Sequence, residues 1–377
     1  MNRRSALIGI GSAIAAMGAG CLLLLHFLLT VGPNRADSTI LSPFASFELM
    51  GEASAVVFSP DGKHLAVGTS TNPTIAKFWK GSLCVYNIAE KAIVHVSELD
   101  QWVQGLAFSP DGNYLAVAIS SVNLRGEGFL GFQKKVGCIL LFQFPEMKEL
   151  RRVEPAPELG AIAFSQDGKR VLASCSRIQY MDGWVEILSV PDLAPLARTE
   201  EVPKLPNLVY SRVKDELMLN HTGPDMDGVL VMNAATGNRI RIAERALTPR
   251  VIAVGDDGVV FLNFGKRLDW YDANSKDYRS ASFGRKGIIP NQRCVWYSKT
   301  KQLFACLSSP GGGDRDASEV ILLDLETTTT TVKFESKEFL ITACDFAAKA
   351  DCFAIGTSNF ARGADSRGGK VLLFKND

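Results

Sequence analysis

The side chains that could do chemistry in this chain are few and stand far apart. The four histidines are His26, His64, His95 and His221, and no two of them share the spacing of a metal site or a catalytic pair. The sequence contains no His-Glu-x-x-His, no Gly-x-Ser-x-Gly, no Walker loop and no dinucleotide-binding glycine pattern. We therefore expect no catalytic residue, no metal site and no cofactor.

Four aspartates at similar positions resemble a set of carboxylates that could act together. Each is followed directly by glycine, in the pairs Asp61-Gly62, Asp111-Gly112, Asp167-Gly168 and Asp257-Gly258. In a tight turn, Asp hydrogen-bonds to nearby backbone and Gly adopts the positive φ that other residues avoid. We interpret these eight residues as structural turn residues.

The eight cysteines give no sign of a reactive or metal-binding role. They occur singly, mostly in apolar runs such as Leu83-Cys84-Val85-Tyr86, and there is no Cys-x-x-Cys pair. All except Cys21 lie in the body of the chain, and the odd number there argues against a complete set of disulfides. We expect buried thiols that behave as small apolar side chains.

The overall charge excludes one class of partner. The chain has 41 basic and 40 acidic residues, and it stays close to neutral when Arg3 and Arg4 near the N-terminus are set aside. Nucleic-acid-binding domains carry a marked excess of basic charge on one face. We therefore expect no nucleic-acid partner.

One short motif recurs along the chain and indicates the elements that position these residues. Phe58-Ser59-Pro60-Asp61-Gly62 returns at 108–112 and, with Gln in place of Pro, at 164–168, each time followed by an apolar run. This pattern predicts a β-hairpin. Weaker copies extend the series, whose anchor positions are 58, 108, 164, 210, 254, 297 and 346. Their spacing of 43 to 56 residues suits one four-stranded sheet per repeat.

The same alignment of the repeats indicates whether Cys344 and Cys352 could form a disulfide. Matching Phe346 with Phe58, and Phe353 with Leu65, places Ile355 opposite Cys344. Cys352 is then out of register, so we expect no disulfide between the two cysteines.

A second motif closes each repeat, as an apolar strand that ends in an aromatic or large side chain and then usually a polar one. The instances are Val85-Tyr86-Asn87, Leu141-Phe142-Gln143, Ile187-Leu188-Ser189, Val231-Met232-Asn233, Trp270-Tyr271-Asp272, Leu322-Leu323-Asp324 and Leu373-Phe374-Lys375. With the hairpins, these motifs make residues 44–377 resemble the WD40 and YVTN-like repeat proteins. The chain departs from that family in having no Trp-Asp at the end of the third strand and no Gly-His before the first.

The resemblance implies an all-β fold, a seven-bladed β-propeller over residues 44–377. The seventh repeat ends after its third strand, and residues Phe44 to Leu49 read as one spare strand before the first repeat. We expect this N-terminal strand to complete the last blade, because such closure removes two open sheet edges.

The N-terminus predicts a membrane anchor. Ala6 to Val31 is a run of 26 residues without formal charge, longer than the roughly 20 that cross a bilayer core. Arg3 and Arg4 precede it, so we expect a single-pass anchor at 1–31 with a cytoplasmic N-terminus, a linker at 32–43, and a propeller on the non-cytoplasmic side. The alternatives are a cleaved signal peptide, a lipid-modified Cys21 and a twin-arginine export signal.

Loop lengths point to a binding region. The connection between the second and third strands is long in repeats 1, 2, 6 and 7, which are consecutive on a seven-membered ring. These loops carry basic and aromatic side chains, of the kinds that dominate protein interfaces. The candidate partner-binding residues are Lys77, Phe78, Trp79, Lys80, Arg125, Phe129, Lys134, Lys135, Arg315, Phe360, Arg362 and Arg367.

The sequence therefore favours a membrane-tethered, non-catalytic scaffold that binds a protein or peptide through these loops. A chain that enters the propeller at Phe44 would arrive on the face opposite the loops, which would point them away from the membrane. The alternative is a propeller enzyme, similar to lactonases or dehydrogenases, that uses the central channel. A third possibility is a structural assembly subunit.

Overall fold

The computed structural model describes the chain from Ile40 to Lys375, with gaps. The residues outside the description are 1–39, 72–79, 121–136, 157, 177–181, 204–207, 212–214, 223–226, 245–249, 255–258, 264–266, 273–277, 283–286, 289–294, 298–301, 309–317, 337, 348–350, 359–367 and 376–377. The described residues are strands and turns, which confirms the all-β prediction. They include no helix long and apolar enough to cross a bilayer, and the predicted anchor and most of the predicted linker lie outside them.

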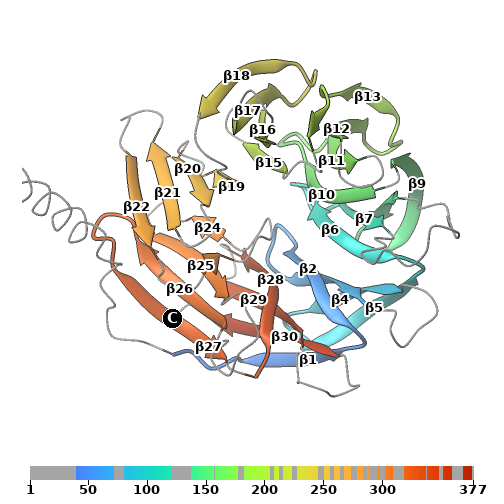
Figure 1. The fold of residues 1–377 in the computed structure, drawn as a ribbon. Coiled ribbons are helices and arrows are strands. Elements are labelled where there is room, and N and C mark those ends of the chain that lie inside the picture. The colour runs from blue at the N-terminus through green and yellow to red at the C-terminus, as the bar shows by residue number, and fades with distance from the viewer. Residues whose placement is uncertain are drawn as a thin grey trace, which may run out of the picture.

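The described strands form seven antiparallel sheets that follow one another around the molecule, as Figure 1 shows. The first three sheets contain β2 (Glu52–Phe58), β3 (His64–Ser70), β4 (Gly81–Asn87) and β5 (Ala92–Leu99); β6 (Trp102–Phe108), β7 (Tyr114–Ser120), β8 (Gly137–Gln143) and β9 (Lys148–Ala156); and β10 (Glu158–Phe164), β11 (Arg170–Ser176), β12 (Asp182–Ser189), β13 (Pro195–Arg198) and β14 (Val202–Pro203). The next two contain β15 (Leu208–Ser211), β16 (Glu216–Thr222), β17 (Asp227–Asn233) and β18 (Arg239–Glu244); and β19 (Arg250–Val254), β20 (Val259–Asn263), β21 (Arg267–Asp272) and β22 (Tyr278–Ser282). The last two contain β23 (Gly287–Ile288), β24 (Val295–Tyr297), β25 (Gln302–Ser308), β26 (Ser318–Asp324) and β27 (Thr330–Ser336); and β28 (Leu340–Ala347), β29 (Cys352–Ser358), β30 (Gly369–Lys375) and β1 (Ala45–Leu49).

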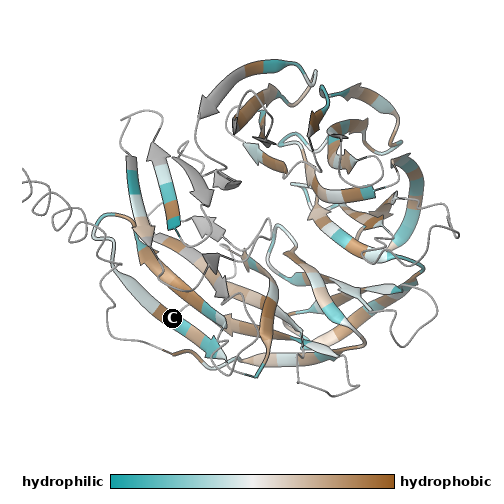
Figure 2. Ribbon diagram, viewed as in Figure 1, coloured by the Kyte–Doolittle hydropathy of each residue, from teal (hydrophilic) through white to brown (hydrophobic). Residues whose placement is uncertain are grey.

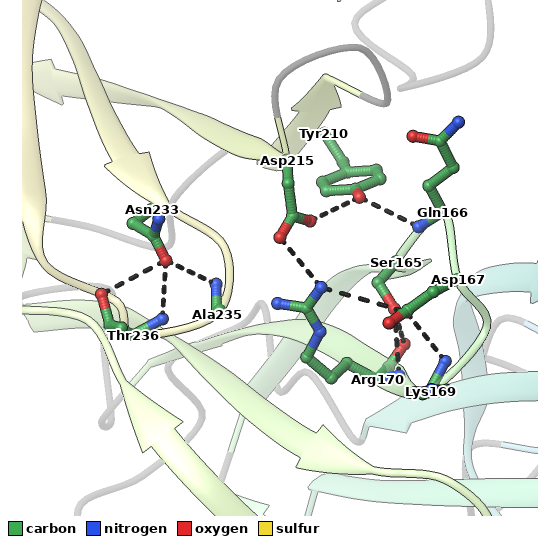
Figure 3. A network of polar contacts seen from close by, with 10 residues as sticks. All are labelled: Ser165, Gln166, Asp167, Lys169, Arg170, Tyr210, Asp215, Asn233, Ala235 and Thr236. Atoms are coloured by element: carbon green, nitrogen blue, oxygen red, sulfur yellow. Dashed lines mark hydrogen bonds and ion pairs between the residues drawn. The ribbon is translucent and has the colours of Figure 1, made fainter.

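Both sequence motifs fall where they were expected. The seven anchor positions all lie in the first strands of their sheets, and the aromatic or large residues of the second motif all lie in third strands. The polar residue that follows the second motif caps the next turn, because Oδ1 of Asn233 accepts the N–H groups of Ala235 and Thr236, each at 2.9 Å (Figure 3). Asn87 and Asp324 do the same in the first and sixth sheets.

The described turn motifs have local hydrogen bonds to the aspartates. In the third repeat, the Ser165 hydroxyl donates to Asp167 Oδ1 at 2.6 Å and accepts the N–H of Arg170 at 3.0 Å (Figure 3). Gly168 has a φ of 70°, as the turn requires. The repeats at Asp61-Gly62 and Asp111-Gly112 have the same hydrogen bonds, whereas Asp257 and Gly258 lie outside the described residues.

The hydrophobic core lies between the sheets. Each of six buried apolar clusters joins two neighbouring sheets: first to second, second to third, third to fourth, fifth to sixth, sixth to seventh, and seventh back to first. The apolar residues, brown in Figure 2, accordingly run along strands of consecutive sheets. Strands buried on both faces explain why the third strands read as continuous apolar runs.

The register of the seventh sheet is the one expected from the alignment. Cys344 pairs with Ile355, Phe346 with Phe353, and Cys352 with Ala347. Cys84, Cys138, Cys175 and Cys352 are buried free thiols, and Cys306 and Cys344 are also buried. Burial raises the pKa of the Cys138 thiol to about 11, so it stays protonated near neutral pH.

The N-terminal strand pairs with the last strand of the chain. β1 runs antiparallel to β30, with Ala45 opposite Leu373 and Leu49 opposite Gly369. The chain is held even before this strand, because the N–H of Leu41 donates to the carbonyl of Lys333 at 2.8 Å. The end of the predicted linker therefore already lies against the outer strand of the sixth sheet.

Candidate binding face

The strand registers divide the ring into two faces. Glu52 pairs with Ser70, and Gly81 pairs with Leu99, so the starts of first and third strands share one face with the ends of second and fourth strands. We call it the loop face; it holds Ser70, Ser120, Ser176 and Ser358 at the ends of second strands. The opposite face holds the Asp-Gly turns, and we call it the turn face.

The predicted binding loops start and end on the loop face. Of the twelve candidate residues, Lys80 is the one that the structure describes. The others, Lys77, Phe78, Trp79, Arg125, Phe129, Lys134, Lys135, Arg315, Phe360, Arg362 and Arg367, lie outside the described residues. The described part of the candidate site therefore consists of the residues at the bases of these loops.

The base of the first long loop is held together by Thr71 and Lys80. The N–H and the hydroxyl of Thr71 both donate to the carbonyl of Lys80, at 2.9 and 2.7 Å. The hydroxyl also accepts the N–H of Lys80 at 3.2 Å. These bonds fix the two ends of the loop side by side, while the Lys80 side chain stays exposed.

A tryptophan from the second sheet holds the same loop base. The indole Nε1–H of Trp102, the first residue of β6, donates to the carbonyl of Thr71 at 2.9 Å. The indole is half-buried, so part of its ring remains accessible on the loop face. Trp102 therefore joins the first and second sheets and also adds aromatic surface to the site.

Met50 lies next to this loop base through its neighbour in the chain, Gly51. It is the most exposed of the large apolar side chains that the structure describes, at 89%. Its neighbour Gly51 packs so closely that a Cβ there would lie 2.6 Å from the Ser70 carbonyl and 3.0 Å from the Thr71 methyl group. We call Met50, Thr71, Lys80 and Trp102 the Thr71 cluster.

Sequence patterns missed three of these four residues. Met50 lies in a short connection between a fourth and a first strand, and Trp102 directly follows another such connection, so no difference in loop length drew attention to them. Trp102 itself could have drawn attention, because a tryptophan at the partly exposed start of an inner strand is not needed to fill the hydrophobic core.

Tight backbone contacts set the shape of the loop face. A Cβ at Gly81 would lie 2.6 Å from the Gln101 carbonyl and 2.7 Å from the Thr69 carbonyl. The glycines that begin third strands at Gly137 and Gly369 meet backbone carbonyls just as closely. Glycine at these positions lets the connections pack against each other, which makes the loop bases a rigid platform.

Two serine hydroxyls are buried beneath this platform. Ser120 and Ser358 end the second strands just before long loops, and their Oγ atoms are buried without a hydrogen-bond partner among the described residues. In the third sheet, the equivalent Ser176 donates instead to the buried carboxylate of Glu158 at 2.9 Å. Within the described part of the chain, His, Cys, Asp and Glu side chains nowhere gather in a group of three that could hold a metal ion.

A second polar cluster lies on the turn face, between the third and fourth sheets (Figure 3). Arg170 donates to Asp215 Oδ2 at 2.9 Å, and the hydroxyl of Tyr210 donates to Asp215 Oδ1 at 2.6 Å. Tyr210 also accepts the N–H of Gln166 at 2.9 Å. Burial and the carboxylate together raise the pKa of Tyr210 to about 12. Both oxygens of Asp215 are engaged, so this cluster joins two sheets and does not present a binding site.

Comparisons with known proteins identify the fold and nothing narrower. No protein-family profile matches the chain, and no curated protein matches it. A WD40 propeller chain in the crystal structure of the mitotic checkpoint complex has a TM-score of 0.61, with 11% sequence identity, over 90% of this chain and 96% of that chain. The likeness confirms the WD40-like propeller fold.

Proposed function

We propose that this chain is a membrane-tethered, non-catalytic scaffold that binds a protein or peptide on its loop face. The observation that carries the proposal is the Thr71 cluster, where residues at or next to one loop base supply an exposed thioether, a half-buried indole and an exposed lysine. Aromatic residues and Met are enriched at protein interfaces, and Trp is a frequent binding hot spot. A fixed loop base also reduces the entropy that binding costs.

The propeller is inferred to have seven blades and to be closed by its N-terminal strand. Seven sheets among the described residues, the pairing of β1 with β30, and the cluster that joins the seventh sheet to the first all support this. A closed ring gives the loop face a fixed geometry.

Membrane tethering is proposed from the uncharged run Ala6 to Val31. Since Leu41 already bonds to Lys333, residues 32–40 connect this run to the propeller, and nine residues reach at most about 32 Å. β1 begins on the turn face and ends on the loop face. The tether would therefore hold the turn face toward the membrane and present the loop face to a partner.

The proposal can be tested by capturing partners with the full-length chain. The test variant is Met50→Ala with Lys80→Ala, which leaves the Thr71 and Trp102 hydrogen bonds in place. The control is Leu196→Ala with Lys169→Ala, which removes an exposed apolar and an exposed basic side chain away from the loop face.

We expect at least one protein that is captured by the wild type and the control but lost by the test variant. Identical partners for all three proteins would contradict binding at the Thr71 cluster. Turnover of a small molecule by the purified chain, without any protein partner, would favour the enzyme alternative.

A further inference from the structure

The outer strand of the first sheet carries unusual apolar exposure. Among the described strands, β5 pairs with β4 alone, and it lies at the outer rim of its sheet (Figure 1). Its side chains Ile93, Val94 and Val96 are 41%, 50% and 58% exposed. From Ala92 to Ser97 the strand has no Lys, Arg, Asp or Glu. Exposed strand edges of this kind readily pair with another strand.

Other described outer strands are protected against such pairing. β9 carries Lys148, Glu149, Arg151, Arg152 and Glu154, and it also contains Pro155. β13 begins with a proline and ends with Arg198, and the edge of β27 is already occupied by Leu41. Charges, proline and a covering segment are the usual means by which proteins block edge pairing. β5 uses none of them in its central part.

The charges at the two ends of β5 indicate which strand it would accept. Lys91 lies exposed just before the strand, while Glu98 and Asp100 lie exposed at its end. Glu90, at the basic end, accepts a hydrogen bond from Asn87 at 3.0 Å within its own turn. If two copies of β5 run antiparallel, the Lys91 end of each meets the acidic end of the other, twice by symmetry. A parallel arrangement would bring like charges together.

The centre of the strand is also suited to self-pairing. The His95 ring hydrogen-bonds to Ser97 of the same strand at 2.6 Å, so its polarity is satisfied locally. The register shift in β5 between its pairings with Val85 and Tyr86 recurs at the equivalent position in the outer strands of the second, third and fourth sheets. The shift is therefore a feature of the repeat and is not particular to this edge.

We propose that β5 pairs antiparallel with β5 of a second copy of this chain, about a twofold axis near the middle of the strand. This edge is separate from the loop face, so the self-pairing does not depend on the proposed function. One added strand pair is a small interface compared with the roughly 1,200–2,000 Å² of a typical stable complex. A shared membrane would strengthen it by raising the effective concentration.

Cross-linking in cells that express the full-length chain tests the contact directly. Val96→Cys is introduced after Cys21 and Cys294 have been replaced by Ser, because the six described cysteines are buried. A short bis-maleimide should then link two copies and give a band of twice the chain mass. Leu196→Cys, which is 55% exposed on β13, is the matched control and should not cross-link.

Reversing the charges at the ends of β5 distinguishes specific self-pairing from nonspecific association. In the Val96→Cys background, Lys91→Glu makes both ends of β5 acidic, and Glu98→Lys combined with Asp100→Asn makes both ends basic. Each variant alone should give about tenfold weaker self-association. Two differently tagged variants expressed together, one of each kind, should recover cross-linking between unlike tags.

The outcomes decide the proposal. Recovery of cross-linking only in the mixture would establish antiparallel self-pairing, because a folding defect could not be repaired by a second defective chain. The proposal would be overturned by the absence of a dimer band from Val96→Cys, by a product with a different protein, or by cross-linking in either charge variant alone that is as strong as in the Val96→Cys parent.

Discussion

The backbone N–H of Phe58 donates to Oδ2 of Asp345 at 2.7 Å, a contact between residues 287 positions apart. Phe58 ends the inner strand of the first sheet, and Asp345 lies on the inner strand of the seventh. This contact joins the first sheet to the seventh, whose last strand also pairs with the N-terminal strand β1. The contact lies near the turn face, at the end of β2 opposite to the end that lies on the loop face.

Replacing Asp345 by Ala should destabilise the protein by about 1–3 kcal/mol, because the half-buried Phe58 N–H would lose a charged acceptor. Asp345→Asn keeps an acceptor and should cost less. Asp192→Ala breaks only the exposed ion pair with Arg151, which is worth about 0–1 kcal/mol. The measurement is urea unfolding of all three variants. A loss for Asp345→Ala no larger than that for Asp192→Ala would count against the role of this contact.

The Asp-Gly turns should make stability depend on acidity. The hydrogen bond from the Ser165 hydroxyl, followed by the Lys169 N–H, lowers the pKa of Asp167 from its ordinary value of 3.8. A carboxylate with a lowered pKa stabilises the fold above its ordinary pKa, and this contribution is lost as the pH falls through the lower, folded-state value.

Ser165→Ala should therefore cost about 1 kcal/mol at pH 7. The difference from wild type should narrow as the pH falls below 3.8, because Asp167 becomes protonated and the hydrogen bond loses its charged acceptor. Urea unfolding at a series of pH values gives both quantities. If the difference in unfolding free energy between wild type and Ser165→Ala stayed constant until Asp167 is fully protonated, the hydrogen bond would not favour the charged form of Asp167.

The backbone contacts of Gly81 predict a steric effect on the loop base. Gly81→Ala forces a methyl group against the carbonyls of Gln101 and Thr69, at 2.6 and 2.7 Å, and should cost about 1–3 kcal/mol. Gly112→Ala is the comparison, because its nearest neighbour would be the Cδ of Pro60 at 3.7 Å and only its positive φ opposes the change. Thermal unfolding should rank Gly81→Ala as the less stable variant. The reverse order would mean that the loop bases are not tightly packed.

The Tyr210 cluster should lose its stabilising effect at high pH. The raised pKa of about 12 means that the folded protein favours the neutral phenol. An unfolded tyrosine ionises near pH 10, so the stabilisation is complete below that pH and decreases as the pH rises toward 12. The stability advantage of wild type over Tyr210→Phe should shrink over this range in urea unfolding. An unchanged advantage would indicate that Tyr210 is not held neutral by burial and Asp215.

The repeat pattern predicted the hairpins because the residues that form each turn are close together in the sequence. Asp167 and Gly168 meet their requirements within a few residues, and the alignment of Phe353 with Leu65 carried the register to Cys344 and Ile355. Strand counting also predicted that residues 44–49 pair with the last strand. In these cases the residues that bond to each other are close in the sequence or are aligned by the repeat, so their spacing was enough to predict the pairing.

The candidate site was harder to predict because its residues come from separate repeats. Trp102 bonds to Thr71 across a sheet boundary, and no periodicity links a residue of one repeat to the backbone of another. Differences in loop length between the repeats did direct attention to Lys80 and to the loop face. The binding residues predicted within the loops themselves remain predictions.

Site-specific photo-cross-linking at Met50 tests the central claim most directly. A photoreactive amino acid replaces Met50 in the full-length chain, and a second chain carries it at Leu196 as the control. Irradiation of intact cells should give a discrete adduct with another protein from position 50 but not from position 196. Adding Lys80→Glu should weaken that adduct. No protein adduct at position 50, or the same adduct from both positions, would contradict binding on the loop face.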